Sequence, residues 1–211
     1  MAGTLALLGG GEFSDLSEAL DRRLLAASGG TEVVVLPTAD AFEHPERLVT
    51  AAEASFAGLG ATVQGAMVLR RIDALDPSSA DHLTGAKFVY VVGDSQLHLK
   101  SVLKQTPLWD ALLAVLDRGG VVAASGASAS ALCDPMLDSR GGGVTLGLEL
   151  VTGLVFVPHA ETLTAEWLKR TRSLAGTATV VEARTGSAIV RTDAGWECLG
   201  AVEVHGELPL S

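Results

Sequence analysis

GGVVAASGASASA, residues 119–131, is the stretch from which the rest of this 211-residue chain is interpreted. An apolar run typical of a buried strand leads into Gly126, and very small residues then surround Ser128 before a segment compatible with a helix. A serine with small residues two positions before and after it, here Gly126 and Ser130, is typical of a strained strand-to-helix turn that exposes a nucleophilic hydroxyl. The pattern predicts Ser128 Oγ at the carboxyl edge of a sheet, where helix N–H groups favour an oxyanion. The alternative is a loop of small residues without chemistry.

Strand-like and helix-like segments alternate on both sides of this stretch. Near-continuous apolar strands separated by helices predict the α/β class, with a mostly parallel central sheet between two helical layers. In the tail, the Asp193-Ala194-Gly195 turn predicts antiparallel strands at one sheet edge. No linker or repeat divides the chain, so residues 1–211 are predicted to form a single domain. The expected strands are 4–8, 32–37, 62–69, 87–92, 148–157, 178–182, 187–190 and 196–204, and the expected helices include 43–59 and 164–174.

Composition excludes several classes of function. A net charge of −10 argues against a general nucleic-acid binder, because phosphate neutralisation needs a basic face. No apolar run approaches the length of a membrane span, and the opening apolar segment lacks the basic residue that precedes a signal peptide core. Cys133 and Cys198 lie far apart and not in a metal-ligand spacing. We therefore expect a cytoplasmic protein with no metal or organic cofactor that binds neither nucleic acid nor a membrane.

A base for Ser128 has to come from another strand-end loop at the same edge of the sheet. Of the five histidines, His159 fits best, because it directly follows an apolar strand and Pro158 fixes its approach. The other histidines are interpreted as surface or capping residues. Among these, His98, which follows Gln96 on an expected helix, could also line the pocket.

Five short motifs occur in a fixed order along nearly the whole chain. They are Gly9-Gly10-Gly11-Glu12, Pro37-Thr38-Ala39, Gly93-Asp94-Ser95-Gln96-Leu97-His98-Leu99, Gly126-Ala127-Ser128-Ala129-Ser130-Ala131 and Pro158-His159. In this order and spacing the sequence resembles the serine peptidase family of aspartyl dipeptidase (peptidase E) and cyanophycinase. The resemblance implies a fold similar to class I glutamine amidotransferases. It also implies Ser128 as nucleophile, His159 as general base, and an oxyanion hole from the backbone N–H groups of Gly93 and Ala129.

The sequence departs from the family pattern at two positions. The family usually carries Gly-x-Ser-Ala-Gly-Ala, and Ser130 replaces its second glycine, where a side chain could crowd the turn or donate a hydrogen bond into the pocket. Asp94 stands where the strand-end loop normally has a second glycine, and its carboxylate would oppose negative charge in the transition state. With Gln96, these residues are predicted to line the substrate side of the site. Both changes leave open a shifted specificity or an inactive relative.

Three carboxylates are candidates for the third member of the triad. The spacing His159-Ala160-Glu161 is similar to the His-x-Glu of the amidotransferases and favours Glu161. Glu182, at the end of an expected strand, resembles a recurrent glutamate of the family. Asp138 lies between Ser128 and His159 in the chain, as the acid of the dipeptidase branch does. Any of them could orient the imidazole and stabilise its cation.

The sequence thus predicts a serine hydrolase that cleaves a small peptide or amide through an acyl-enzyme. The resemblance implies cleavage next to an aspartyl group, which requires a cation; Lys169, Arg170 and Arg172 are candidates, although a solvated helix face is their alternative interpretation. The rival prediction is a catalytically inactive relative that binds a ligand or serves as an assembly protein. An amidotransferase-like partner protein is disfavoured because a thiol nucleophile is missing. A homodimer is a further expectation.

Overall fold

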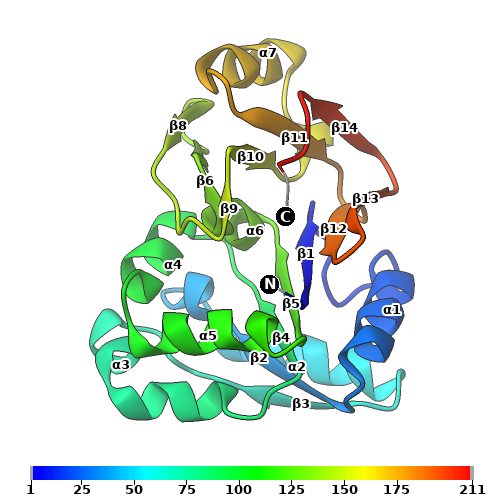
Figure 1. Cartoon of the computed structure of the whole chain (residues 1–211), viewed down its shortest axis with the longest axis vertical. Helices are drawn as coiled ribbons and strands as arrows, with labels where there is room; N and C mark the ends of the chain where they lie inside the picture. The colour runs from blue at the N-terminus through cyan, green and yellow to red at the C-terminus, as the bar shows by residue number, and fades with distance from the viewer. Residues whose placement is uncertain (1, 210–211) are drawn as a thin grey trace.

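The computed structural model describes residues 2–209 and has a seven-stranded central sheet. Five of its strands are parallel and the two at one edge, β12 and β13, are antiparallel (Figure 1). This confirms the predicted α/β class with a mostly parallel sheet. In spatial order the strands are β13 (Gly195–Leu199), β12 (Ala188–Thr192), β1 (Thr4–Leu8), β5 (Val121–Ser125), β4 (Phe88–Val91), β2 (Glu32–Leu36) and β3 (Thr62–Gly65).

Helices cover both faces of this sheet, because successive strand residues point to opposite sides. On one face Ala6 and Leu8 pack with residues of α1 (Glu18–Ser28) and α2 (Pro45–Ala57), among them Leu24 and Phe56. The other face, with Leu5 and Leu7, packs with α3 (Arg71–Leu75), α4 (Gln96–Leu103), α5 (Pro107–Asp117) and α6 (Ala127–Leu132). Two short 3₁₀ helices, η1 (Thr38–Asp40) and η2 (Pro77–Leu83), belong to this second layer, and a third, η3 (Ala160–Thr162), follows His159 beside the smaller sheet.

A smaller sheet stands beyond the carboxyl end of the central one, at the top of Figure 1. It contains β10 (Leu154–Val157), β11 (Thr179–Ala183) and β14 (Val202–His205), and α7 (Ala165–Leu174) packs against it. Two short ladders connect this part to α6. They are β6 (Cys133–Asp134) with β9 (Val151–Thr152), and β7 (Met136–Asp138) with β8 (Gly143–Thr145).

Three expected strands differ from the structure. The expected strand 148–157 is β9 and β10 in two different sheets, because the chain turns at Gly153, which has a φ of +75°. The expected strand 196–204 is two strands in two sheets, because the chain turns at Gly200, which has a φ of +77°. The expected strand 62–69 ends at Gly65, because β2, its one neighbour in the sheet, ends at Leu36 before Pro37. The tail therefore adds an antiparallel edge to the central sheet, as predicted, and also builds the smaller sheet.

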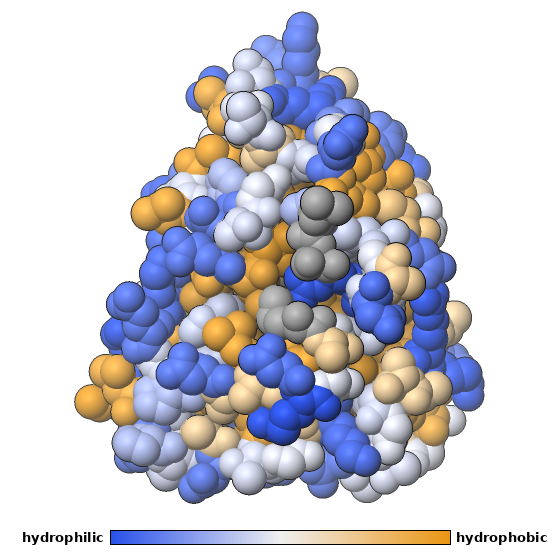
Figure 2. Space-filling model, viewed as in Figure 1, coloured by the Kyte–Doolittle hydropathy of each residue, from blue (hydrophilic) through white to orange (hydrophobic). Residues whose placement is uncertain are grey.

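The described residues contain no helix that is both long and apolar enough to cross a membrane. On the face shown in Figure 2, hydrophilic side chains cover much of the surface and apolar ones lie between them in smaller areas. The loops after β1, β4 and β5 converge at one end of the central sheet, where parallel α/β sheets place their ligands. This end is where the smaller sheet and the loop after β10 approach it.

Candidate active site

The strand-to-helix turn predicted from the sequence is present, and Gly126 is its strained residue. Strand β5 ends at Ser125, Gly126 has φ 59° and ψ −131°, and α6 begins at Ala127. The backbone N–H of Gly126 donates to the carbonyl of Leu8 at 3.0 Å, which fixes the turn to the end of β1. Residues other than glycine rarely adopt this backbone conformation, and residues that do adopt it cluster at functional sites.

His159 lies over this turn from the loop after β10. The backbone of His159 is in the left-handed region, with φ 50°, and its N–H donates to the carbonyl of Gly9 at 2.9 Å. Its ring packs directly on Gly10, where an added Cβ would lie only 1.9 Å from His159 Cε1. His159 Nε2 lies 3.4 Å from the position that a Cβ on residue 126 would occupy. The glycine motif after β1 thus allows the imidazole to approach the turn.

The other side of the imidazole is held by a residue that sequence reasoning missed, Thr185. Its Oγ1 lies 3.1 Å from His159 Nδ1 and donates to Glu161 Oε1, and its backbone N–H donates to Glu161 Oε2 at 3.2 Å. Because that hydroxyl donates to the carboxylate, it accepts from Nδ1–H, and this contact selects the neutral tautomer whose Nε2 lone pair is directed at the turn.

The Glu161 carboxylate is matched to this role. Loss of some solvent around this exposed carboxylate opposes its ionisation, but the hydrogen bonds from Thr185 and from its own backbone, with the charge of His159, outweigh that effect and lower the pKa of Glu161 below its ordinary value. Glu161 therefore stays ionised and reaches the imidazole through a hydroxyl instead of directly.

Ser128 occupies a different position from the one its motif predicts. It is fully buried, and its Oγ donates to the carbonyl of Gly93 at 3.0 Å. No hydrogen bond joins Ser128 to His159 in the described part of the chain. The exposure predicted for this hydroxyl is wrong, because Ser128 lies two residues past the strained turn, inside the first turn of α6. Its assignment as nucleophile stays a prediction.

The predicted oxyanion groups are only partly available. Gly93 follows β4 with φ 114°, and an added Cβ would lie 2.6 Å from the backbone N of Asp40. The amide of Ala129 is already used, because it donates to the carbonyl of Gly126 at 3.1 Å in the first turn of α6. The amides of Gly93 and Ala127 donate to no acceptor among residues 2–209. Ala127 is thus a better candidate donor than the predicted Ala129.

Gln96 and Ser130, predicted on the substrate side, instead hold the chain at Leu137. Gln96 Nε2 donates to the Leu137 carbonyl, and Ser130 Oγ accepts from the Leu137 N–H at 3.3 Å. Both residues are buried. Ser130 does not crowd the turn, because it lies four residues beyond Gly126 within α6.

The other two acid candidates have different partners. Asp138 forms an ion pair with Arg140 at 2.9 Å. Glu182 is buried, and its carboxylate contacts Arg172 Nη1 at 2.6 Å and His205 Nε2 at 3.4 Å. Glu182, His205 and Glu203 place potential metal-ligand atoms within 4.8 Å of one another, but the Arg172 guanidinium already compensates the buried carboxylate. This cluster is an ion-pair network, separate from the hydrogen bonds that join His159, Thr185 and Glu161, here called the histidine network.

Acidic side chains surround the turn. Glu12 Oε2 accepts from Ser125 Oγ at 2.6 Å, and Asp40 Oδ1 accepts from the N–H of Asp94 at 3.1 Å. Loss of solvent around the carboxyl raises the pKa of Asp94, and the charges of Asp40 and Glu12 raise it further, while His159 acts in the opposite direction. The site therefore carries a local negative potential.

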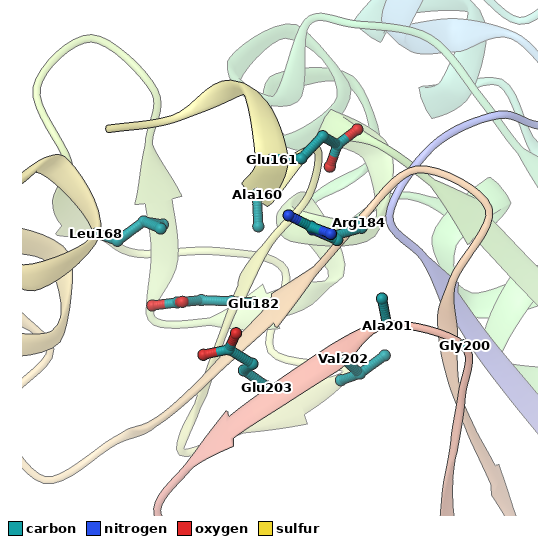
Figure 3. Close-up of a pocket in the computed structure, with 9 residues that line it drawn as sticks. All are labelled: Ala160, Glu161, Leu168, Glu182, Arg184, Gly200, Ala201, Val202 and Glu203. Carbon is teal, nitrogen blue, oxygen red and sulfur yellow. The ribbon is translucent and has the colours of Figure 1, made fainter. Parts of the chain in front are cut away.

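A hollow of about 330 Å³ lies beside Glu161 of the histidine network, between η3 and the smaller sheet (Figure 3). Its residues include Glu161 and Arg184 on one side and Glu182 and Glu203 on the other, with the last two carboxylates turned toward each other. Glu161 thus belongs both to the histidine network and to the wall of this hollow. The hollow provides space for part of a small ligand beside Glu161, but neither His159 nor Gly126 lines it.

Comparisons with known proteins agree with the fold. The model of peptidase family S51 matches residues 5–198. The crystal structure of a peptidase from an acI-B1 Actinobacterium is similar, with a TM-score of 0.86 and 22% identity over 99% of this chain and 93% of that chain. A protein assigned as peptidase E from Listeria monocytogenes EGD-e has a TM-score of 0.63 and 17% identity over 98% of this chain and 100% of that chain. At these identities the two structures show the fold alone. The chain matches no curated protein sequence.

Proposed function

The chain belongs to peptidase family S51, a family of serine peptidases, and from this premise we propose that it hydrolyses a small peptide or amide at the Gly126 turn with His159 as general base. The observation that carries the proposal is the orientation of the imidazole. Thr185, whose hydroxyl donates to Glu161, holds Nδ1, and Nε2, which has no hydrogen bond to residues 2–209, faces the strained turn. A base oriented by a third group is the arrangement that nucleophilic hydrolysis needs.

The proposed reaction uses groups already in place. Nε2 of His159 takes the proton of the attacking group and then gives it to the leaving amine. Glu161 stabilises the imidazolium through the Thr185 hydroxyl. The N–H groups of Ala127, after the turn, and of Gly93, in a neighbouring strand-end loop, are the candidates for stabilising the oxyanion. No metal or organic cofactor has a part in this scheme.

In the route that the sequence predicts, Ser128 attacks the carbonyl and forms an acyl-enzyme. This route requires the Ser128 side chain to leave the Gly93 carbonyl, its partner at 3.0 Å, and to become exposed beside His159. It makes Ser128 the residue that a fluorophosphonate probe, which reacts with activated serines, would label in the native chain.

The charge around the turn bears on the substrate. Glu12, Asp40 and Asp94 oppose the approach of a substrate carboxylate, and Arg172, one of the predicted cations, is engaged by Glu182. We therefore propose substrates with a neutral or cationic residue next to the scissile bond, in preference to the aspartyl substrates that the family resemblance implies. Lys169 and Arg170 remain available on the exposed surface of α7.

The test is hydrolysis of a dipeptide and aminoacyl-amide library by the purified chain, with His159→Ala and His205→Ala as a matched pair. His159→Ala is expected to lower kcat/KM by about 10²- to 10⁴-fold, the usual contribution of a general base. His205→Ala, in the ion-pair cluster, is expected to change it little. Hydrolysis that survives in His159→Ala would exclude this residue as the base.

A second candidate function is binding of the same small ligands without turnover. It is favoured by the burial of Ser128, because a sealed hydroxyl does not form an acyl-enzyme. Calorimetric binding of library peptides without any product, in the native chain and equally in Ser128→Ala, would support it.

A further inference from the structure

We propose that position 126, and not position 128, is the nucleophile position of this fold, and that the native chain, with glycine there, forms no acyl-enzyme. Only the final step of this inference, attack by water, rests on the proposed function. The assignment of position 126 stands on backbone geometry and on the direction of the imidazole.

The backbone identifies the position. In a strand-to-helix nucleophile turn, the nucleophile is the strained residue between the last strand residue and the helix, and the next N–H contributes to the oxyanion hole. Here Gly126 is that residue, with φ 59° and ψ −131°, and the N–H that follows belongs to Ala127. No residue of α6, Ser128 included, has a positive φ.

The imidazole identifies the same position independently. Among residues 2–209, a Cβ built on Gly126 would have one neighbouring atom within 4 Å apart from its own chain neighbours, and that atom is His159 Nε2 at 3.4 Å. A hydroxyl carried on that Cβ would reach hydrogen-bond distance of Nε2. A side chain at position 126 would therefore meet the base without any collision.

Ser128 does not supply the missing hydroxyl. Its Oγ lies outside the 4 Å shell around that Cβ position and donates instead to the Gly93 carbonyl. Ser125, on the other side of the turn, is 1% exposed and donates to Glu12. Each neighbouring serine thus already has a partner in the fold.

The chemistry that follows is direct attack by water. The water oxygen forms a bond to the substrate carbonyl carbon while its proton passes to His159 Nε2. That proton then goes to the nitrogen as the C–N bond breaks, which gives a carboxylic acid and an amine and consumes one water molecule. No covalent enzyme intermediate forms.

The experiment compares fluorophosphonate labelling of the native chain with Gly126→Ser, Gly126→Ala and the double variant Gly126→Ser/His159→Ala, with the label located by fragmentation mass spectrometry. In Gly126→Ser the introduced oxygen would bond to phosphorus and displace fluoride, while its proton passes to His159. We expect labelling at position 126 in this variant, none in the native chain or in Gly126→Ala, and a loss of about 100-fold or more in the double variant. Gly126→Ala is the matched control, because it has the same backbone strain without the hydroxyl.

Labelling of the native chain at Ser128 would overturn the inference, and so would a Gly126→Ser variant that melts cooperatively yet is not labelled. If Gly126→Ser fails to fold, labelling of the native chain still tests the inference, because a label on Ser128 would make that residue the nucleophile. A native chain that hydrolyses no peptide, together with labelled Gly126→Ser, would refute the proposed function and leave position 126 assigned.

Discussion

The carboxylates near the Gly126 turn and the carboxylate of Glu182 differ in how their charge is compensated. Glu12, Asp40 and Asp94 lie near the turn, and Asp21, buried in α1, interacts with the charge of Glu12. These four carboxylates, here called the acidic edge, take part in no salt bridge with any described residue. Glu182, only 4% exposed, is paired with Arg172 and His205 in what we call the paired cluster. The two regions share residue types but not electrostatics.

This difference separates a functional region from a structural one. A buried carboxylate held by a guanidinium connects β11 to α7 and needs no further partner. Carboxylates without a salt bridge, close to a strained glycine and an oriented imidazole, repel one another and lower the stability of the fold. Folding alone does not require such an arrangement. The acidic edge is therefore expected to bind or position something, whereas the paired cluster is expected to stabilise the smaller sheet.

The largest expected effect is on stability at the acidic edge. Burial raises the pKa of Asp21 to about 6, and the charge of Glu12 raises it further, while Ser17, which donates to Asp21 Oδ2 at 2.7 Å, lowers it. The folded chain thus holds this proton more tightly than the unfolded chain, and its stability falls as the pH rises from about 4 to about 6. Above that window Asp21→Asn is expected to raise the free energy of unfolding by about 3 kcal/mol.

Urea unfolding of the native chain and Asp21→Asn at pH 4 and pH 7.5 measures this effect. The gain should be small at pH 4 and full at pH 7.5. Asp15→Asn, on the exposed surface before α1, is the control and should show no such pH dependence. An equal effect of Asp21→Asn at both pH values would contradict the assignment.

The second effect is expected in the paired cluster. Arg172→Met removes the guanidinium from a buried carboxylate and should lower the free energy of unfolding by about 1.5–3 kcal/mol, the range for a hydrogen bond to a charged group. Arg22→Met, which breaks an exposed pair with Glu18, should cost about 0.5 kcal/mol or less. Thermal and urea unfolding measure both. If Arg172→Met is as mild as Arg22→Met, Glu182 is not compensated by Arg172.

The third effect is expected in catalysis and tests the link between imidazole and carboxylate. Thr185→Val removes the hydroxyl that joins His159 Nδ1 to Glu161, so kcat should fall about tenfold, equivalent to 1.4 kcal/mol, with KM little changed. Thr185→Ser should retain most of the activity. Thr162→Val, whose hydroxyl contacts the His159 carbonyl and not the ring, is the control. Equal losses in Thr185→Val and Thr162→Val would mean that Thr185 only supports the loop.

The sequence predicts the fold because most strands of the central sheet are local apolar runs and the glycine turns are local too. It also predicts His159, because a histidine directly after a buried strand needs no long-range information. It does not predict which small residue occupies the strained turn. That depends on where β5 ends, and β5 ends at Ser125 because its partner β1 ends at Leu8. Residues 125, 128 and 130 are all serine, so the local pattern fits more than one frame.

Thr185 shows a second limit of the sequence. It lies 26 residues after His159, and only the parallel pairing of β10 with β11 brings the loops after these strands together. Glu161, which the His-x-Glu spacing favours, does belong to the histidine network. That spacing did not predict that Glu161 reaches the imidazole through the Thr185 hydroxyl. Contacts set by strand pairing are not encoded in any short motif.

The smallest expected effect bears most directly on the comparison of the two regions. Ser128→Ala removes a buried hydrogen bond to the Gly93 carbonyl and should cost about 1 kcal/mol of stability. Ser130→Ala, which leaves the buried Leu137 N–H without its acceptor, should cost as much or more. If Ser128 is structural, its variant will behave as Ser130→Ala does, with peptide hydrolysis lowered no further than the lost stability accounts for. A loss of about 100-fold or more in kcat with that same mild destabilisation would instead place the Ser128 hydroxyl at the reacting carbonyl, because a structural serine does not produce such a separation of rate from stability.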